Sequence, residues 1–441
     1  MTTVHIIGAG LAGLACAARL LQATTSHTLR IEIHEAARHP GGRCRTFYDT
    51  HLSRRIDNGN HLLLSANQAV LSYLHAVSET PFPRAGIPNT FFTPSETVFP
   101  FYDHATGEHW SIHPNQGIAP WWLFCPSRRI PKTSVRDYLS PNALRLLTAG
   151  ADACVADCIP KADPLHRRFW EPLCLAVMNA PPTIAAAAPL RAVLLKTFGR
   201  GATYCKPLIA RDGLSDALID PAVAFLKRRG TEIRFGHRAR ALRFTQKRVE
   251  RLEFAGESES SVIELGENDC VVLATPPAVT ANLAPNISAP QESSAIINAH
   301  FRLDSSPTLP ELRAPFLGLI NTTAHWLFVR DDVVSLTISG ADNLLETPEN
   351  ALIAQLWKEA ATALSLPANG SPPPHRIIKE KRATFAQTPS NFRLRPAPTT
   401  AWRNLFLAGD WTDTGLPATM ESAVLSGQRA ATLVNRFRLK I

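Results

Sequence analysis

The stretch VHIIGAGLAG, residues 4–13, decides the fold of this chain. Residues 4–7 form a short apolar run rich in β-branched side chains, which predicts a buried strand. Residues 11–23 have the composition of a helix, and residues 29–33 alternate apolar and polar side chains as a second strand does. A strand, a helix and a second strand within the first 35 residues predict a βαβ unit in a fold of the α/β class.

The glycines of this stretch match GxGxxG at the place where the strand passes into the helix. Gly8 permits a tight turn, Gly10 lets the backbone approach a pyrophosphate, and Gly13 lets helix and strand pack closely. The free N–H groups of the helix N-terminus favour a phosphate. Glu35, 22 residues after Gly13, suits a ribose diol and would repel a 2′-phosphate, so NADP is not expected here. The contacts predicted for this Rossmann-type site are Gly8, Gly10, Leu11, Ala12, Gly13, Glu35 and Ala36.

Composition limits the remaining possibilities. The 441 residues suggest two or three domains, and 45% hydrophobic with 19% charged residues exclude a disordered chain. The net charge of +9 is not gathered into a dense basic run, so no nucleic-acid partner is expected. The eight cysteines form no CxxC pair, and we expect reduced thiols and no metal site. No window of 18 apolar residues predicts a membrane-spanning helix.

Other elements follow from the same kind of pattern. Residues 270–274 and 404–408 read as buried strands, and residues 419–437 as a last helix. Residues 214–229 read as helical, with Pro221 in the first turn of a second segment. Further strands are expected at 231–235, 238–244, 248–254, 262–265, 316–320, 325–329 and 333–339, and a further helix at 349–364.

Two later stretches complete a flavoprotein pattern. Residues 41–46, GGRCRT, resemble the second fingerprint of the amine-oxidase and phytoene-desaturase type of FAD enzyme, in which Arg43 would lie on the pyrophosphate. Residues 407–411, LAGDW, are followed by a helix whose N-terminus would face the flavin. No cysteine lies in that segment, so the resemblance implies noncovalent FAD. The further contacts it implies are Gly42, Arg43, Asn58, Gly59, Ala239, Gly409, Asp410, Ala418, Thr419 and Met420.

This resemblance implies a discontinuous Rossmann-type FAD-binding domain with an inserted, mixed α+β substrate domain. The FAD-binding domain is expected to comprise residues 1–80, 205–285 and 386–441. The substrate domain is expected to comprise residues 81–204 and 286–385.

Several other stretches are more specific. Residues 57–63, DNGNHLL, are similar to the DNGQHLL stretch of hydroxysqualene dehydroxylases, with Asn60 in place of Gln. Residues 170–176, WEPLCLA, residues 381–385, KRATF, and residues 415–421, GLPATME, are similar to stretches of the same family. The similarity covers nearly the whole chain and is weakest at residues 80–130.

The resemblance implies that reduced FAD removes the hydroxyl group of hydroxysqualene, giving squalene and water in squalene or hopanoid biosynthesis. His61 is the first candidate for the acid that protonates the leaving hydroxyl, because histidine titrates in the useful range. Asp57 is a second candidate, with a turn-fixing role as its alternative. Aromatic faces could stabilise a cationic intermediate or simply form the core. These aromatic candidates lie in residues 121–124 and at Phe198, Trp326 and Phe328.

The implied substrate is a long isoprenoid that resides in a bilayer. We therefore expect a cytoplasmic protein that contacts the inner face of the cytoplasmic membrane, and an electron donor that the sequence does not identify. Trp121 and Trp122, just before Arg128, Arg129 and Lys132, are candidates for that contact, with burial as the alternative. Rival functions are a polyene desaturase, an amine oxidase, or a flavin fold that binds a prenyl chain or protein partner without turnover.

Overall fold

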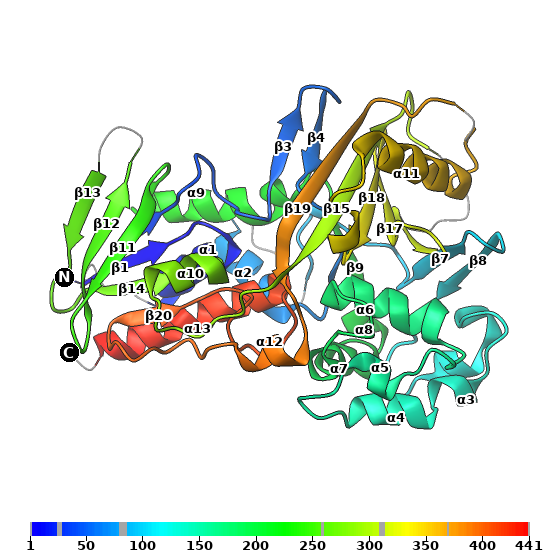
Figure 1. Cartoon of the computed structure of the whole chain (residues 1–441), viewed down its shortest axis with the longest axis horizontal. Helices are drawn as coiled ribbons and strands as arrows, with labels where there is room; N and C mark the ends of the chain where they lie inside the picture. Colours follow the sequence, from blue (N-terminus) through cyan, green and yellow to red (C-terminus); the bar gives the residue numbers. More distant parts are fainter. Residues whose placement is uncertain are drawn as a thin grey trace.

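The computed structural model describes residues 2–23, 29–78, 86–256, 260–307, 314–367 and 370–439. Two sheets organise it (Figure 1). Both ends of the chain lie near the smaller sheet, whereas a group of short helices lies below the larger one. None of the helices in the described ranges is both long and apolar enough to cross a bilayer.

The smaller sheet is parallel throughout and contains the N-terminal βαβ unit. Its strand order is β10-β2-β1-β14-β20. The strands are β1 (Thr2–Ile7), β2 (Leu29–His34), β10 (Glu232–Arg234), β14 (Cys270–Leu273) and β20 (Leu405–Leu407). All five strands were expected from the sequence, and the α/β class is confirmed.

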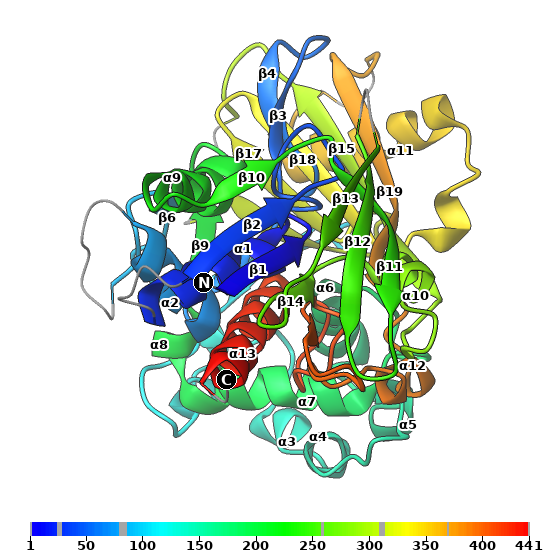
Figure 2. The same ribbon diagram turned by 90° about the vertical axis from the view of Figure 1, so that its left-hand side faces the viewer.

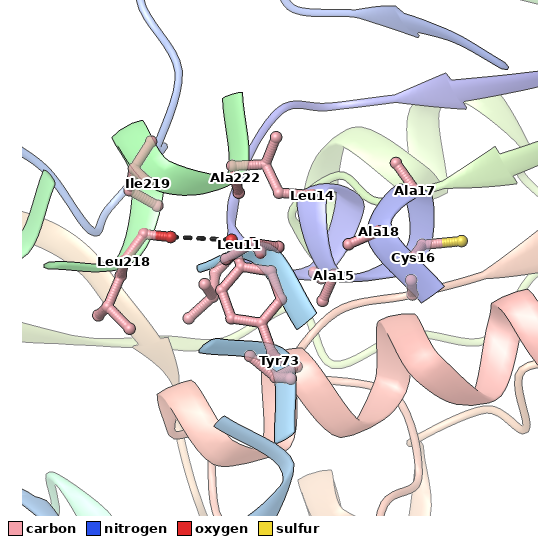
Figure 3. Close-up of a cluster of buried hydrophobic side chains, with 14 of the residues drawn as sticks. Leu11, Leu14, Ala15, Cys16, Ala17, Ala18, Tyr73, Leu218, Ile219 and Ala222 are labelled. Atoms are coloured by element: carbon pink, nitrogen blue, oxygen red, sulfur yellow. Dashed lines mark hydrogen bonds between the residues drawn. The ribbon is translucent and has the colours of Figure 1, made fainter. Parts of the chain in front are cut away.

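Helices cover one face of this sheet. They are α1 (Leu11–Ala23), α2 (Gln68–Val77), α9 (Asp220–Arg228), which continues the helical turn η5 (Ser215–Ile219), and α13 (Met420–Arg438). Pro221 lies in the first turn of α9, as expected. Figure 3 shows α1 packed beside Tyr73, whose phenol donates a hydrogen bond to the Leu218 carbonyl at 2.8 Å. A buried phenol with such a partner fixes α2 against η5 at no desolvation cost.

A three-stranded antiparallel meander covers the other face of the parallel sheet (Figure 2). It consists of β11 (Arg238–Phe244), β12 (Val249–Ala255) and β13 (Ser260–Glu264), with α10 (Pro277–Leu283) beside it. Alternate residues of the central strands supply the two cores: Val272 faces the helices, whereas Val271 and Leu273 pack with Leu252 and Phe254 of the meander. This alternation is the period-two pattern that a strand buried on both faces must satisfy.

The larger sheet has seven strands in the order β19-β15-β18-β17-β16-β7-β8. They are β7 (Phe99–Asp103), β8 (Glu108–Ile112), β15 (Ser293–Arg302), β16 (Phe316–Ile320), β17 (Trp326–Arg330), β18 (Val333–Ser339) and β19 (His375–Phe385). Helix α11 (Glu349–Ala363) packs with β15, β16, β17 and β18 in one apolar core, and residues of the short helices join β7, β8 and β16 in another.

The short helices between residues 121 and 205 form the lower layer of Figure 1. They are η1 (Trp121–Phe124), η2 (Pro126–Arg128), α3 (Val135–Tyr138), α4 (Pro141–Leu147), α5 (Val155–Cys158), η3 (His166–Trp170), α6 (Glu171–Met178), α7 (Ala187–Lys196), η4 (Phe198–Arg200) and α8 (Ala202–Cys205). The remaining elements are β3 (Thr46–Asp49), β4 (Arg54–Asp57), β5 (Leu63–Leu64), β6 (Phe91–Phe92), β9 (Pro207–Ala210), η6 (Asp342–Leu344) and α12 (Pro389–Arg393).

All eight cysteines are free thiols, as expected. The domain boundaries themselves remain a prediction.

Candidate flavin site

The first glycine loop has the geometry that its sequence predicts. Gly8 has φ +110°, and a Cβ there would lie 2.6 Å from the carbonyl oxygen of Ala274, the residue after β14. A Cβ on Gly13 would overlap the carbonyl of Gly8. Both positions therefore require glycine because the helix and the strand approach each other too closely for a side chain.

Gly10 differs because it faces open space. No described atom lies within 4 Å of the position that a Cβ would take there. The second fingerprint lies alongside, since the Gly41 N–H donates to the Ala9 carbonyl at 2.9 Å. Gly42, at φ +58°, also approaches Gly10. Two glycine-rich segments thus line a backbone cradle that fits a pyrophosphate.

Glu35 lies at the carboxyl end of β2, beside this cradle. Its carboxylate accepts hydrogen bonds from the Ala9 N–H at 2.7 Å and the Ala37 N–H at 2.8 Å. The backbone of Glu35 also accepts the N–H of His237 at 2.8 Å, which brings the start of the meander close to it. Ala239 follows two residues later, so the segment expected to cover an adenine lies beside Glu35.

The C-terminal stretch meets the second fingerprint through an ion pair. Arg43 donates to the Asp410 carboxylate at 2.7 Å and to the Ala383 carbonyl at 2.6 Å. The negative charge of Asp410 raises the pKa of Arg43, so the guanidinium stays charged. The GGRCRT, LAGDW and KRATF stretches therefore meet at one place.

Two residues that sequence reasoning missed hold this C-terminal loop. Arg395 is buried and donates to the carbonyls of Leu416, Asp410 and Thr412. Gln387, also buried, accepts the Ala418 N–H at 2.8 Å and donates to the Met178 carbonyl. Neither residue belongs to a recognisable motif, because each acts through partners that are distant in sequence.

The N-terminus of α13 is capped within its own turn. The Thr419 hydroxyl accepts the Ser422 N–H at 3.3 Å, which places Ala418, Thr419 and Met420 at the helix start. Glu421 points elsewhere: its two carboxylate oxygens accept the backbone N–H groups of residues 69 and 70 at the start of α2. Burial raises the pKa of Glu421, and the two N–H groups oppose that rise.

The DNGNHLL stretch connects the two large units of the structure. Asp57 accepts hydrogen bonds from the Thr46 hydroxyl at 2.5 Å, the Leu214 N–H at 2.9 Å and Arg330 of β17 at 2.7 Å. A carboxylate with three such partners is held in place, which favours its positioning role over the role of an acid.

A polar chain continues from this stretch into the seven-stranded sheet. Asn60 donates to the Thr337 hydroxyl at 3.1 Å, which in turn donates to the Asn298 amide oxygen at 2.8 Å. Asn298 also reaches the Asn58 carbonyl at 3.4 Å. These buried polar groups fix residues 58–60 against β15 and β18.

His61 follows directly and is half-buried. No described residue hydrogen-bonds to its ring. Burial lowers the pKa of His61, while the nearby Asp57 charge raises it in part. Its neighbours Leu62 and Leu64 pack against the apolar cluster that contains Phe169, Trp170 and the short helices. The histidine therefore lies between the predicted flavin region and an aromatic core.

The aromatic candidates divide into two groups. Phe198 lies 6.0 Å from Phe99 between ring centroids, and Trp326 lies 5.7 Å from Phe101, so both join the buried aromatic cluster. Phe328 is buried as well. In the 121–124 segment, Trp122 is buried but Trp121 is 68% exposed. The prediction that Trp122 contacts the membrane is therefore wrong, because its ring is buried in the protein interior.

The comparisons with known proteins agree with this geometry. Residues 11–435 match the family described as flavin containing amine oxidoreductase. A protein named hydroxysqualene dehydroxylase from Rhodopseudomonas palustris is 44% identical over 98% of both chains. One of the same name from Sinorhizobium fredii is 41% identical over 98% of this chain and 97% of its own. The chain belongs to the hydroxysqualene dehydroxylase family.

Solved structures show that this member of the hydroxysqualene dehydroxylase family has an amine-oxidase fold. Cyclohexylamine oxidase from Brevibacterium oxydans aligns over 100% of both chains with a TM-score of 0.66 at 14% identity. Putrescine oxidase aligns over 98% of both chains with a TM-score of 0.65 at 16% identity. An oxidoreductase from Methanosarcina mazei aligns over 97% of this chain and 99% of its own with a TM-score of 0.69 at 13% identity.

This family member is a flavin-dependent oxidoreductase. The open space at Gly10, the paired glycine loops and the Arg43–Asp410 pair fit the pyrophosphate half of such a cofactor. The remaining contacts named from the sequence stay predictions, as does noncovalent attachment of FAD.

Proposed function

We propose that this chain replaces the hydroxyl group of hydroxysqualene by hydrogen, giving squalene and water. The observation that carries this proposal is the 44% identity to a protein named hydroxysqualene dehydroxylase over 98% of both chains. The reaction breaks an allylic C–O bond, and the hydroxyl leaves as water after accepting a proton. When bound, reduced FAD would supply the hydride that forms the new C–H bond.

The residues of the chain have three tasks in this reaction. The glycine cradle and the Arg43–Asp410 pair bind and orient the cofactor. The apolar cluster beside Leu62 and Leu64 keeps water from the allylic cation that forms when the hydroxyl leaves. His61, which lies between the two, donates the proton to the hydroxyl. It is half-buried, and no described residue hydrogen-bonds to its ring, so the ring is available to the substrate.

An anaerobic single-turnover experiment tests this function. The purified holoenzyme is reduced with dithionite, hydroxysqualene is added, and flavin absorbance and squalene are followed together. We expect the flavin to reoxidise in step with one squalene formed per flavin. Two results would overturn the assigned substrate: reoxidation without squalene, or oxygen consumption when amines are added instead of hydroxysqualene. Neither result would change the conclusion that the protein binds a flavin.

We also propose that the chain takes this substrate from an anionic membrane surface through the segment between residues 118 and 147. Among the described residues, this segment holds six of the fourteen exposed large hydrophobic side chains. They are Ile118, Trp121, Phe124, Leu139, Leu144 and Leu147. Arg128 and Lys132 are exposed in the same segment. Exposed apolar groups beside cations suit insertion below anionic lipid headgroups.

A further inference from the structure

Three buried side chains gather between the parallel sheet and the meander, where the last of them directly precedes Glu35. They are His5 on β1, and Glu32 and His34 on β2, each less than a tenth exposed. His5 is the register partner of Glu32, and His34 is two positions further along the same strand. All three therefore project from one face of the sheet, toward Phe254 of β12.

The distances among these side chains match those of metal ligands. His5 Nδ1 lies 3.3 Å from His34 Nε2 and 3.6 Å from Glu32 Oε2, and His34 Nε2 lies 3.9 Å from that same oxygen. Zinc–ligand bonds of about 2.0–2.2 Å in a tetrahedron place neighbouring ligand atoms about 3.3–3.6 Å apart. The three atoms thus form one triangular face of a tetrahedron, slightly expanded.

Outer partners hold the ligands in the required orientation. His34 Nδ1 lies 3.0 Å from His237 Nδ1, and His237 Nε2 lies 2.8 Å from the Ser261 hydroxyl of β13. With the proton on His34 Nδ1, this chain would leave the lone pair of Nε2 free for a metal ion. Arg30 binds the other oxygen of Glu32 at 2.8 Å, which leaves Oε2 to face the two histidines. Metal-binding histidines and carboxylates usually have such outer partners.

The types of side chain in the cluster also suit a divalent cation. Metal ions bind the neutral form of imidazole. The negative charges of Glu32 and Asp269 act on His5, and the positive charges of Arg30 and Arg234 oppose them, with Arg234 lying 3.9 Å from Glu32 Oε2. Two neutral imidazoles and a carboxylate are the ligand types that zinc accepts.

We propose that His5, Glu32 and His34 bind one divalent transition-metal ion of the zinc type, with water as the fourth ligand. The ion would fix β1 and β2 on the inner side, where the meander covers them. Because Glu35 follows His34 directly, the site would hold the strand end that carries the ribose carboxylate. This is a structural metal site, and it does not depend on the proposed reaction.

Metal binding to the full-length holoenzyme tests the proposal. After dialysis against a chelator, the protein is titrated with Zn²⁺, and separately with Co²⁺ while the visible spectrum is recorded. We expect one Zn²⁺ per chain, a higher midpoint of thermal unfolding with zinc, and the intense visible bands of tetrahedral Co²⁺. Glu32→Gln and His5→Gln should each weaken zinc binding at least tenfold, and His237→Gln should weaken it about tenfold, as loss of an outer partner does.

His51→Gln provides the matched control, because His51 is exposed and lies outside the cluster. It should bind zinc as the wild type does. The proposal is overturned if the wild type binds no zinc, or if Glu32→Gln and His5→Gln bind it unchanged. Should both variants fail to fold, the Co²⁺ spectrum of the wild type still decides, since an octahedral spectrum or none contradicts the site.

Discussion

At the scale of single residues, Gly10 and Gly13 belong to the same motif but have different reasons for being glycine. Gly13 is constrained by the protein itself, because a Cβ there would overlap the Gly8 carbonyl. Gly10 has open space at its Cβ position, so we predict that a bound ligand is what requires glycine there. Within three positions of one motif, Gly13 is therefore required for folding, whereas we expect Gly10 to be required for binding.

We predict opposite outcomes for the two substitutions. Gly10→Val should leave the thermal unfolding of the FAD-free protein nearly unchanged, because no neighbouring atom lies within 4 Å of the new Cβ, but should abolish copurified FAD. Gly13→Val should destabilise the fold severely, because its Cβ would overlap the Gly8 carbonyl oxygen, which the backbone cannot easily move. Flavin absorbance per chain and circular dichroism measure both effects. A yellow Gly10→Val protein would contradict the cradle.

The protonation of His61 gives a second residue-scale prediction. Because burial lowers its pKa below the ordinary value, the protonated form that serves as an acid declines as pH rises from acid through neutral. Above this pKa, kcat/KM should fall by about tenfold for each pH unit. His61→Gln should be slow, and its rate should no longer change with pH in this range. His51→Gln should keep the wild-type slope. An unchanged slope in His61→Gln would remove His61 from the proton transfer.

At the scale of elements, the parallel sheet could be predicted from sequence because its central strands β1 and β14 are short apolar runs between turn signals. The two longest strands, β15 and β19, were missed for a physical reason. β15 carries Asn298 and His300 at buried positions, where their side chains are satisfied by Thr337 and Ser335 of β18. Such polar residues disrupt the apolar alternation by which a strand is recognised. β19 pairs only with β15, at one edge of the sheet, and carries several charged side chains there.

In the candidate site, too, some residues could be placed from the sequence and others could not. Motifs that act through their own backbone, such as the glycine loops and the start of α13, could be placed from sequence. Glu421 could not, because its carboxylate caps α2, some 350 positions earlier in the chain. The cluster of His5, Glu32 and His34 also left no sequence signature. Its members come together only because β1 and β2 are paired in a particular register.

At the scale of the whole molecule, the exposed apolar side chains are unevenly distributed. Trp121 and Phe124 are 68% and 61% exposed, and their ring centroids are 5.8 Å apart. Trp122 and Leu123, between them, are buried and anchor the turn. The turn packs against α3, beside the short helices that form the lower layer of Figure 1. Two adjacent aromatic rings on an anchored turn can enter a lipid surface without any rearrangement of the fold.

We therefore predict that Trp121→Ser with Phe124→Ser will weaken binding to anionic liposomes at least tenfold, because burying each aromatic ring contributes about 1.5–3 kcal/mol. FAD content and thermal unfolding should not change, since both rings lie on the surface. Val262→Ser, at an equally exposed apolar position on β13, is the control and should bind as the wild type does. Liposomes without anionic lipid should bind more weakly, because Arg128 and Lys132 lose their partners. If the double variant partitions into anionic liposomes like the wild type, the substrate must enter from another face of the molecule.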